Sequence, residues 1–124
     1  MAAVKVLLRE FVARTQTEEK AVYYDFSVNG DEIFCREAYL GAEGVLAHLT
    51  NVRVLLEKML TLCALTRLEV HGPAAELDKL RGALGGLNPT WFSFECGIKR
   101  GAIAQTKMLL AGNPSRRPAW CQLH

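Results

Sequence analysis

The chain alternates between two spacings of apolar residues. Near the N-terminus, apolar residues recur every three or four positions from Val4 to Val12, which is the spacing of one face of a helix. The same spacing returns over Ala42–Cys63, where the apolar stripe is wide enough to be covered on more than one side. It returns again over residues 73–84, where Pro73 follows Gly72 and suits the first turn of a helix. The pattern therefore predicts three helices.

Apolar residues at every second position predict strands between these helices. Residues 21–28 and 32–39 flank Asn29-Gly30, a dipeptide favoured in two-residue type I′ turns because both central positions need a positive φ. Thr66–His71 and Thr90–Ile98 have the same alternation. The order of elements predicts an α+β fold with helices on one face of an antiparallel sheet.

Length and composition predict one folded domain followed by a tail. The chain has 124 residues, half of them apolar, which is enough to bury a core. After Ile98 the pattern weakens, and glycines and prolines become frequent. We expect a domain over residues 1–98 and a basic, loosely ordered tail over residues 99–124, with a short helix at residues 103–110 as the alternative.

Charge and cysteine usage exclude several classes of function. A net charge of +2 is too small and scattered to predict a nucleic-acid partner, and no apolar run is long enough to span a membrane. The N-terminus has no secretory pattern. The cysteines are far apart and lack metal-ligand spacing, so we expect no metal site and a reducing cytoplasmic location; they are Cys35, Cys63, Cys96 and Cys121.

A short motif resembles one known family. Glu37-x-Tyr39 is followed by Ala47-His48-Leu49 within the long helix, and this pattern is similar to one in antibiotic-biosynthesis-monooxygenase-like domains. The resemblance covers about residues 7–97. It implies a ferredoxin-like α+β unit that pairs sheet to sheet into a dimeric α/β barrel. The family includes cofactor-free oxygenases of small aromatic polyketides, haem-degrading proteins and proteins that act on quinols.

The chain departs from the family pattern in two places. Some members carry a second histidine in the long helix, but here the corresponding residues 50–53 contain none, so no haem ligand is expected. Family members also begin with a strand that lies inside the sheet, whereas this chain begins at the helix. We therefore expect four strands, with the opening strand missing. The sheet would close by direct pairing or with a strand borrowed from a partner or from the tail.

Five residues are candidates for a site. Glu37 and Tyr39 share one strand face, and His48 borders the buried stripe of the long helix. If that strand face is covered, a glutamate, a tyrosine and a histidine would form a polar cluster in an apolar pocket. We assign His48 and Glu37 as catalytic, and Tyr24, Tyr39 and Phe26 as ligand-binding. In the alternatives His48 is a structural helix residue, Glu37 forms an interface salt bridge, and the aromatic residues belong to the core.

Two functions remain open from the sequence. The first is a cofactor-free, monooxygenase-like enzyme that binds a planar aromatic or quinone-like molecule between sheet and helices. The second is a non-catalytic dimerising or small-ligand-binding module of the same fold. In both we expect a homodimer through the sheet face, because the strands carry apolar residues on both faces, such as Cys35 and Tyr39 against Phe34 and Ala38.

Overall fold

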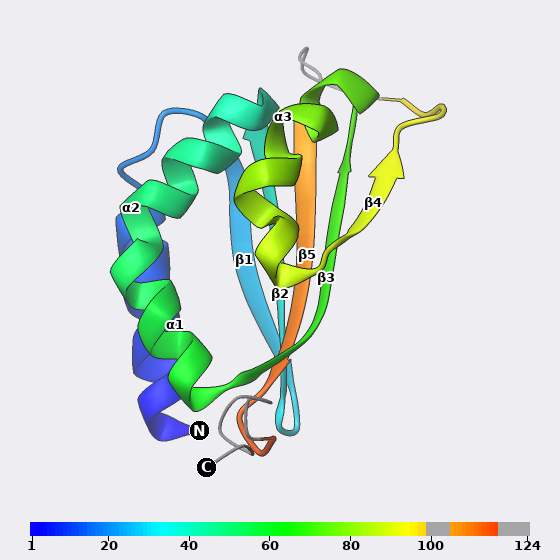
Figure 1. Cartoon of the computed structure of the whole chain (residues 1–124). Helices are drawn as coiled ribbons and strands as arrows, with labels where there is room; N and C mark the ends of the chain where they lie inside the picture. The colour runs from blue at the N-terminus through cyan, green and yellow to red at the C-terminus, as the bar shows by residue number, and fades with distance from the viewer. Residues whose placement is uncertain (99–104, 117–124) are drawn as a thin grey trace.

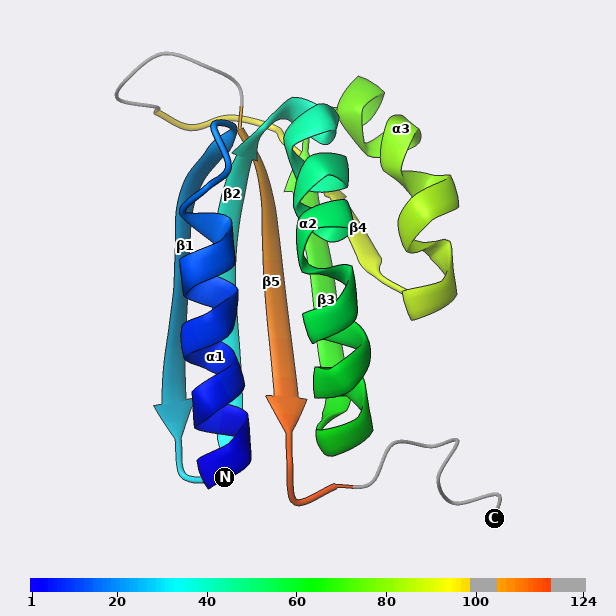
Figure 2. The same cartoon turned by 90° about the vertical axis from the view of Figure 1, so that its left-hand side faces the viewer.

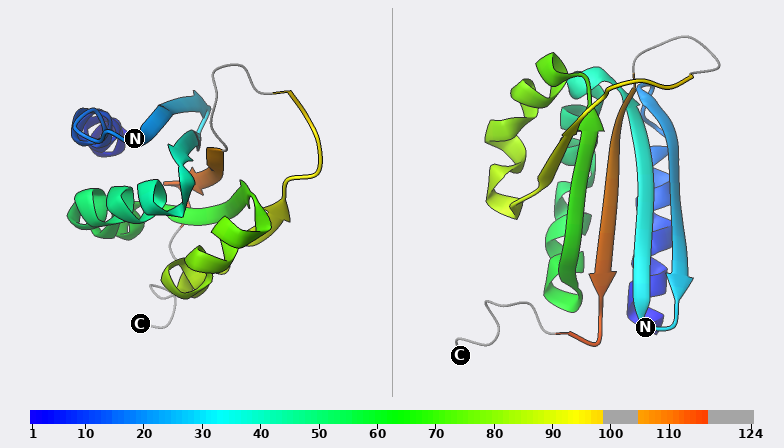
Figure 3. Two further views of the ribbon diagram at one scale, coloured as in Figure 1. Left: turned by 90° about the horizontal axis from the view of Figure 1, so that it is seen from above. Right: turned by 90° about the vertical axis from the view of Figure 1, so that its right-hand side faces the viewer.

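Three helices cover one face of a five-stranded sheet (Figure 1; Figure 3 shows the same layers from above and from the side). The structure is a computed structural model, and it describes residues 1–98 and 105–116. In chain order the elements are α1 (Ala2–Thr15), β1 (Ala21–Asn29), β2 (Glu32–Leu40), α2 (Gly41–Leu62), β3 (Ala64–Gly72), α3 (Ala74–Leu84), a 3₁₀ turn (Gly85–Leu87), β4 (Thr90–Ser93) and β5 (Gln105–Asn113).

The sheet has the strand order β1-β2-β5-β3-β4. Neighbouring strands from β1 to β3 are antiparallel, whereas β4 at the edge runs parallel to β3. The predicted α+β class with helices on one face is confirmed, and the arrangement is compatible with a ferredoxin-like fold. Within the described residues, no helix is both long and apolar enough to cross a membrane.

The predicted count of four strands is wrong, because residues 105–113 form β5 in the sheet. This strand lies between β2 and β3, where we expected a gap left by a missing opening strand. Of the alternatives for closing the sheet, the structure shows the strand taken from the tail. The expectations of a loose tail and of a short helix both fail over these residues. Pairing with β5 provides hydrogen-bond partners for the facing edges of β2 and β3, with one irregularity between Leu65 and Arg67 of β3.

Two smaller expectations are corrected. The hairpin closes on Gly30 and Asp31, with Asn29 paired to Glu32, and only Gly30 of these residues has a positive φ, at 60°. That pattern suits a type II′ turn rather than the predicted type I′ turn. The last predicted strand is also shorter, since β4 ends at Ser93 and residues 94–98 have no regular structure.

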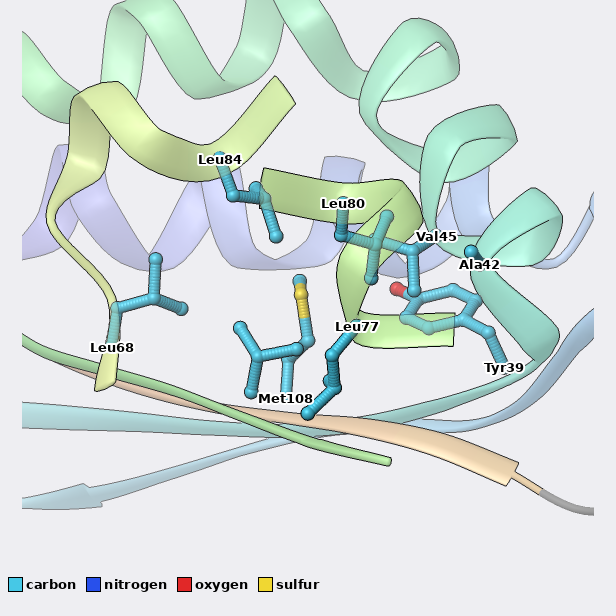
Figure 4. Close-up of a cluster of buried hydrophobic side chains, with 9 residues drawn as sticks. Tyr39, Ala42, Val45, Leu68, Leu77, Leu80, Leu84 and Met108 are labelled. Carbon is cyan, nitrogen blue, oxygen red and sulfur yellow. The ribbon is translucent and has the colours of Figure 1, made fainter. Parts of the chain in front are cut away.

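The buried core consists of three clusters of side chains. Side chains from α2 and α3 pack onto β3, β5 and the end of β2, where Leu77, Val45 and Met108 are among the buried residues (Figure 4). A second cluster lies under α1, where Val4 and Leu8 pack with side chains of β2 and the end of α2 (Figure 2 shows α1 and α2 side by side over the sheet). A third cluster joins the two helices through Leu7, Phe11 and Val52. The candidate residues lie between α1, α2 and the sheet.

Candidate functional site

The start of α2 holds His48 over the centre of β2. A methyl group on Gly44 would lie 2.8 Å from Cβ of Tyr39, so helix and strand touch at this point. His48 follows about one helical turn later. Its side chain is only 3% exposed, and its ring centroid lies 5.0 Å from that of Tyr24 and 5.1 Å from that of Tyr39.

Glu37 is a buried carboxyl group facing His48. The Tyr39 hydroxyl donates to Glu37 Oε1 at 2.7 Å, and the Cys35 thiol donates to Oε2 at 3.1 Å. His48 Nε2 lies 3.7 Å from Oε1, which is too far for a direct hydrogen bond. Burial raises the pKa of Glu37, and this outweighs the lowering by His48 and by the two hydrogen bonds. Burial therefore disfavours the charged form of this carboxyl group.

Glu18 fixes the orientation of the His48 ring from the other side. It lies in the segment between α1 and β1, and its Oε2 and Oε1 atoms are 3.0 and 3.2 Å from His48 Nδ1. Asn51 Nδ2 donates to Glu18 Oε2 at 2.8 Å and to the Arg14 carbonyl at 2.9 Å. The Glu18 carboxylate beside Nδ1 favours the His48 tautomer that carries its proton on Nδ1. The other ring nitrogen, Nε2, faces Glu37 and is then free to accept a proton.

A cavity of about 100 Å³ lies between α1, α2 and the sheet, and both Glu37 and His48 line it. Apart from these two side chains its walls are apolar, aromatic or sulfur-containing. The remaining lining residues are Leu8, Phe11, Tyr24, Phe26, Ile33, Cys35, Leu49, Leu56, Met59, Leu60, Cys63, Ala64, Leu65, Met108, Leu110, Ala111 and Gly112.

The hydroxyl and thiol groups around Glu37 remain neutral donors. Burial is the largest cause that raises the pKa of Tyr24, of Tyr39 and of Cys35. A neutral thiol is a poor nucleophile, so covalent chemistry through Cys35 is disfavoured. The arrangement combines an oriented imidazole with a buried carboxyl group of raised pKa, which suits proton transfer to and from a bound molecule.

The structure brings all five predicted residues to this region. Tyr24, Phe26, Glu37 and His48 line the cavity, whereas Tyr39 contacts Glu37 and is fully buried. Sequence reasoning missed Glu18, which lies in a polar segment with no periodic signal. It also missed Cys35 and Asn51 as partners, although Cys35 was placed on the same strand face as Glu37.

A second histidine cluster lies on the opposite face of the sheet. Val70 points into the core, so the next residue, His71, points to the other face. His71 Nε2 lies 2.9 Å from Glu69 Oε1, and its ring stacks on Phe92 at 4.5 Å between centroids. His71 is absent from the cavity wall. Over residues 1–98 and 105–116, no group of three His, Cys, Asp or Glu side chains could hold a metal ion.

Comparison with known proteins relates the chain to a solved structure. No family model and no curated protein sequence matches it. The crystal structure of MupZ from Pseudomonas fluorescens superposes with a TM-score of 0.76 at 41% sequence identity, over 80% of this chain and 77% of that chain. An identity of 41% over most of both chains indicates common descent as well as a common fold. The chain therefore belongs to the same family as MupZ.

Proposed function

We propose that this protein is a cofactor-free, monooxygenase-like enzyme that acts on a planar aromatic or hydroquinone-type molecule. The observation that carries the proposal is the line of Glu18, His48 and Glu37 at one end of an apolar cavity. An aromatic ring would lie against Tyr24 and Phe26, and its hydroxyl group would meet the polar end. Pockets of this kind use apolar walls for affinity and a few polar groups for orientation.

In the proposed reaction His48 is the general base. Its Nε2 takes a proton from an activated carbon or hydroxyl group of the substrate, and the Glu18 carboxylate stabilises the imidazolium that forms. The electron-rich substrate anion reduces molecular oxygen, and a carbon–oxygen bond forms to give a peroxide anion. The imidazolium returns its proton to the peroxide, and loss of water leaves a carbonyl group. One O₂ thus converts a CH₂ group into C=O and one water molecule.

Oxygen uptake tests this proposal. The purified protein is incubated with an anthrone-type substrate and with a hydroquinone, and uptake is compared with His48→Gln and Glu37→Gln variants whose fold is checked by circular dichroism. His71→Gln is the matched control, because His71 also contacts a buried glutamate but lies on the other face of the sheet. We expect uptake in the wild type and in the control only. Uptake that is equal in all four proteins, or absent from all, overturns the proposal.

The second candidate function is a dimerising module. The open face of the sheet carries the exposed aromatic side chains of Tyr23 and Phe92. It also carries charges of both signs, such as the pair of Arg36 and Asp25, which a second copy could match. We propose a homodimer through this face, in the cytoplasm, where the thiols of Cys35, Cys63 and Cys96 remain free as they are in the structure. Sedimentation of a stable monomer at micromolar concentration would exclude the dimer.

A further inference from the structure

A second cavity, here called the outer cavity, lies where the C-terminal end of α1 approaches the start of β1 (Figure 2). Its volume is about 230 Å³. The residues that line it are Val12, Thr15, Gln16, Glu18, Ala21, Tyr23 and Tyr24. Tyr24 also lines the apolar cavity that contains Glu37 and His48, so one residue borders both cavities.

Glu18 is the one carboxyl group among the described residues that line the outer cavity. Its side chain is only 8% exposed, and it accepts a hydrogen bond from Asn51. No lysine or arginine of residues 1–98 and 105–116 forms an ion pair with it, and His48 neutralises it only while the imidazole is protonated. A buried carboxylate without a matching cation is costly. With a neutral His48, the charge of Glu18 is left to be matched from the side of the outer cavity.

The rest of the outer cavity also favours a positive charge. Val12 and Thr15 lie in the last turn of α1, and the C-terminal end of a helix carries a partial negative charge. Tyr23 and Tyr24 belong to a residue type whose ring attracts organic cations. Arg14, the basic residue of that turn, is not in the wall, and its Nη1 donates to the Asn51 carbonyl. The described wall contains no basic side chain.

The composition of the wall selects an organic cation over a metal ion. A metal ion needs several charged or polar ligands, and the described part of the chain holds no group of three His, Cys, Asp or Glu side chains that could supply them. Val12, Ala21 and the two tyrosines instead offer apolar surface beside a single carboxylate. A cavity of about 150 Å³ in another protein holds one benzene molecule, so the larger outer cavity has room for an ammonium group with a short alkyl chain.

We propose that the outer cavity binds a small organic ammonium ion, with its nitrogen against Glu18 and its alkyl part between α1 and β1. This inference does not depend on the proposed reaction, and its tests need no substrate. Because Glu18 also orients the His48 ring, a cation bound here shares one carboxylate with the candidate site.

A titration followed by nuclear magnetic resonance tests the site, with butylammonium as the probe and butan-1-ol as its neutral match. We expect butylammonium to shift the side-chain amide signal of Asn51 in a saturable way, and butan-1-ol to leave it unchanged. Glu18→Gln should weaken binding by at least about tenfold, because a hydrogen bond to a charged group is lost. Glu19→Gln is the matched control, since Glu19 is exposed and absent from the wall. Equal weakening in both variants, equal binding of the two probes, or no saturation overturns the proposal.

A second pair of variants supplies the cation from the chain itself. Gln16 is an exposed residue of the wall, so Gln16→Lys brings an ammonium group to the outer cavity and should abolish the binding of butylammonium. Ala13→Lys adds the same charge to the last turn of α1 but outside the wall, and should bind butylammonium as the wild type does. Binding that persists in Gln16→Lys, or that is lost equally in Ala13→Lys, contradicts the proposed site.

Discussion

Glu37 is the residue on which the candidate site depends. Its carboxyl group is 3% exposed, and a buried polar group is tolerated only when its hydrogen bonds are made. Tyr39 and Cys35 supply two of them from the same face of the same strand. The alternation of β2 predicts this group of three, because residues two apart share a face. The position of Glu18 could not be predicted, since a segment between a helix and a strand has no period that fixes where a side chain points.

The raised pKa of Glu37 predicts how stability depends on pH. Folding favours the neutral carboxyl group, so its contribution is full below the ordinary carboxyl pKa and is lost as the pH rises through the raised value. Glu37→Gln keeps an amide of the same shape that does not titrate. We expect the free energy of unfolding of this variant to rise relative to the wild type between pH 4 and pH 8. Each tenfold change in the ionisation constant corresponds to about 1.4 kcal/mol.

Urea unfolding of both proteins at several pH values measures this difference. Titrating groups that do not interact with Glu37 have the same effect in the two proteins, so their contributions cancel in the comparison. A difference that is constant with pH would show that folding does not shift the pKa of Glu37, and one that falls with pH would show that the hydrogen bonds and His48 stabilise the carboxylate more than burial destabilises it.

At the scale of elements, the contact between α2 and β2 sets the position of His48. The helix was predicted from its apolar stripe, but the closeness of the contact depends on Gly44, whose role the pattern does not reveal. A glycine inside a helix costs about 1 kcal/mol relative to alanine, so propensity alone would favour its replacement. Here the absent methyl group is what allows the helix to lie against Tyr39.

Two alanine substitutions separate helix propensity from packing. Gly44→Ala should destabilise the protein by about 1–3 kcal/mol, because the added methyl group would lie 2.8 Å from Tyr39 Cβ and 3.1 Å from Lys20 Cβ. Gly82→Ala in α3 is the control, since nothing lies within 4 Å of its added methyl group. That variant should be more stable by up to about 1 kcal/mol. Thermal unfolding of both variants checks the signs, and a stabilising Gly44→Ala would contradict the close contact.

The strand β5 was the main element that the sequence did not predict. Its inward residues, Met108 and Leu110, alternate with the outward residues Lys107 and Leu109. Because Leu109 is apolar as well, Met108–Leu110 is a continuous apolar run, and the alternation typical of a strand is hidden. Gly112 and Pro114 nearby are typical of a loop. Tertiary contacts place the segment in the sheet, because the facing edges of β2 and β3 carry rows of backbone N–H and C=O groups whose hydrogen bonds only another strand satisfies.

Substitutions at adjacent positions of β5 test which face each side chain occupies. Leu110→Asn puts an amide into the core and the cavity wall, and should cost about 2–4 kcal/mol of unfolding free energy. Leu109→Asn lies on the open face and should cost less than about 1 kcal/mol in the monomer. Urea unfolding compares the two. Equal losses would mean that the strand is not held in this register.

At the scale of the whole molecule, a cavity exists because the core is divided. One cluster packs α3 and α2 onto β3 and β5, two others pack α1 onto α2 and the sheet, and the cavity lies between the first cluster and these two. The sequence predicted the three helices and their common face, and with them a region between sheet and helices that contains Glu37 and His48. It could not predict the shape of that region, because Met108, Leu110 and Gly112 of the wall come from β5.

The central claim is that the polar end of the cavity takes a proton from a bound hydroxyl group. Absorbance of 4-nitrophenol measures this directly, because its phenolate and phenol forms absorb at different wavelengths. At a pH where the free compound is mostly neutral, we predict that binding to the wild type and to His71→Gln produces the phenolate band, and that binding to His48→Gln does not. A bound phenol that remains neutral in the wild type, or a phenolate band that survives in His48→Gln, would contradict the account.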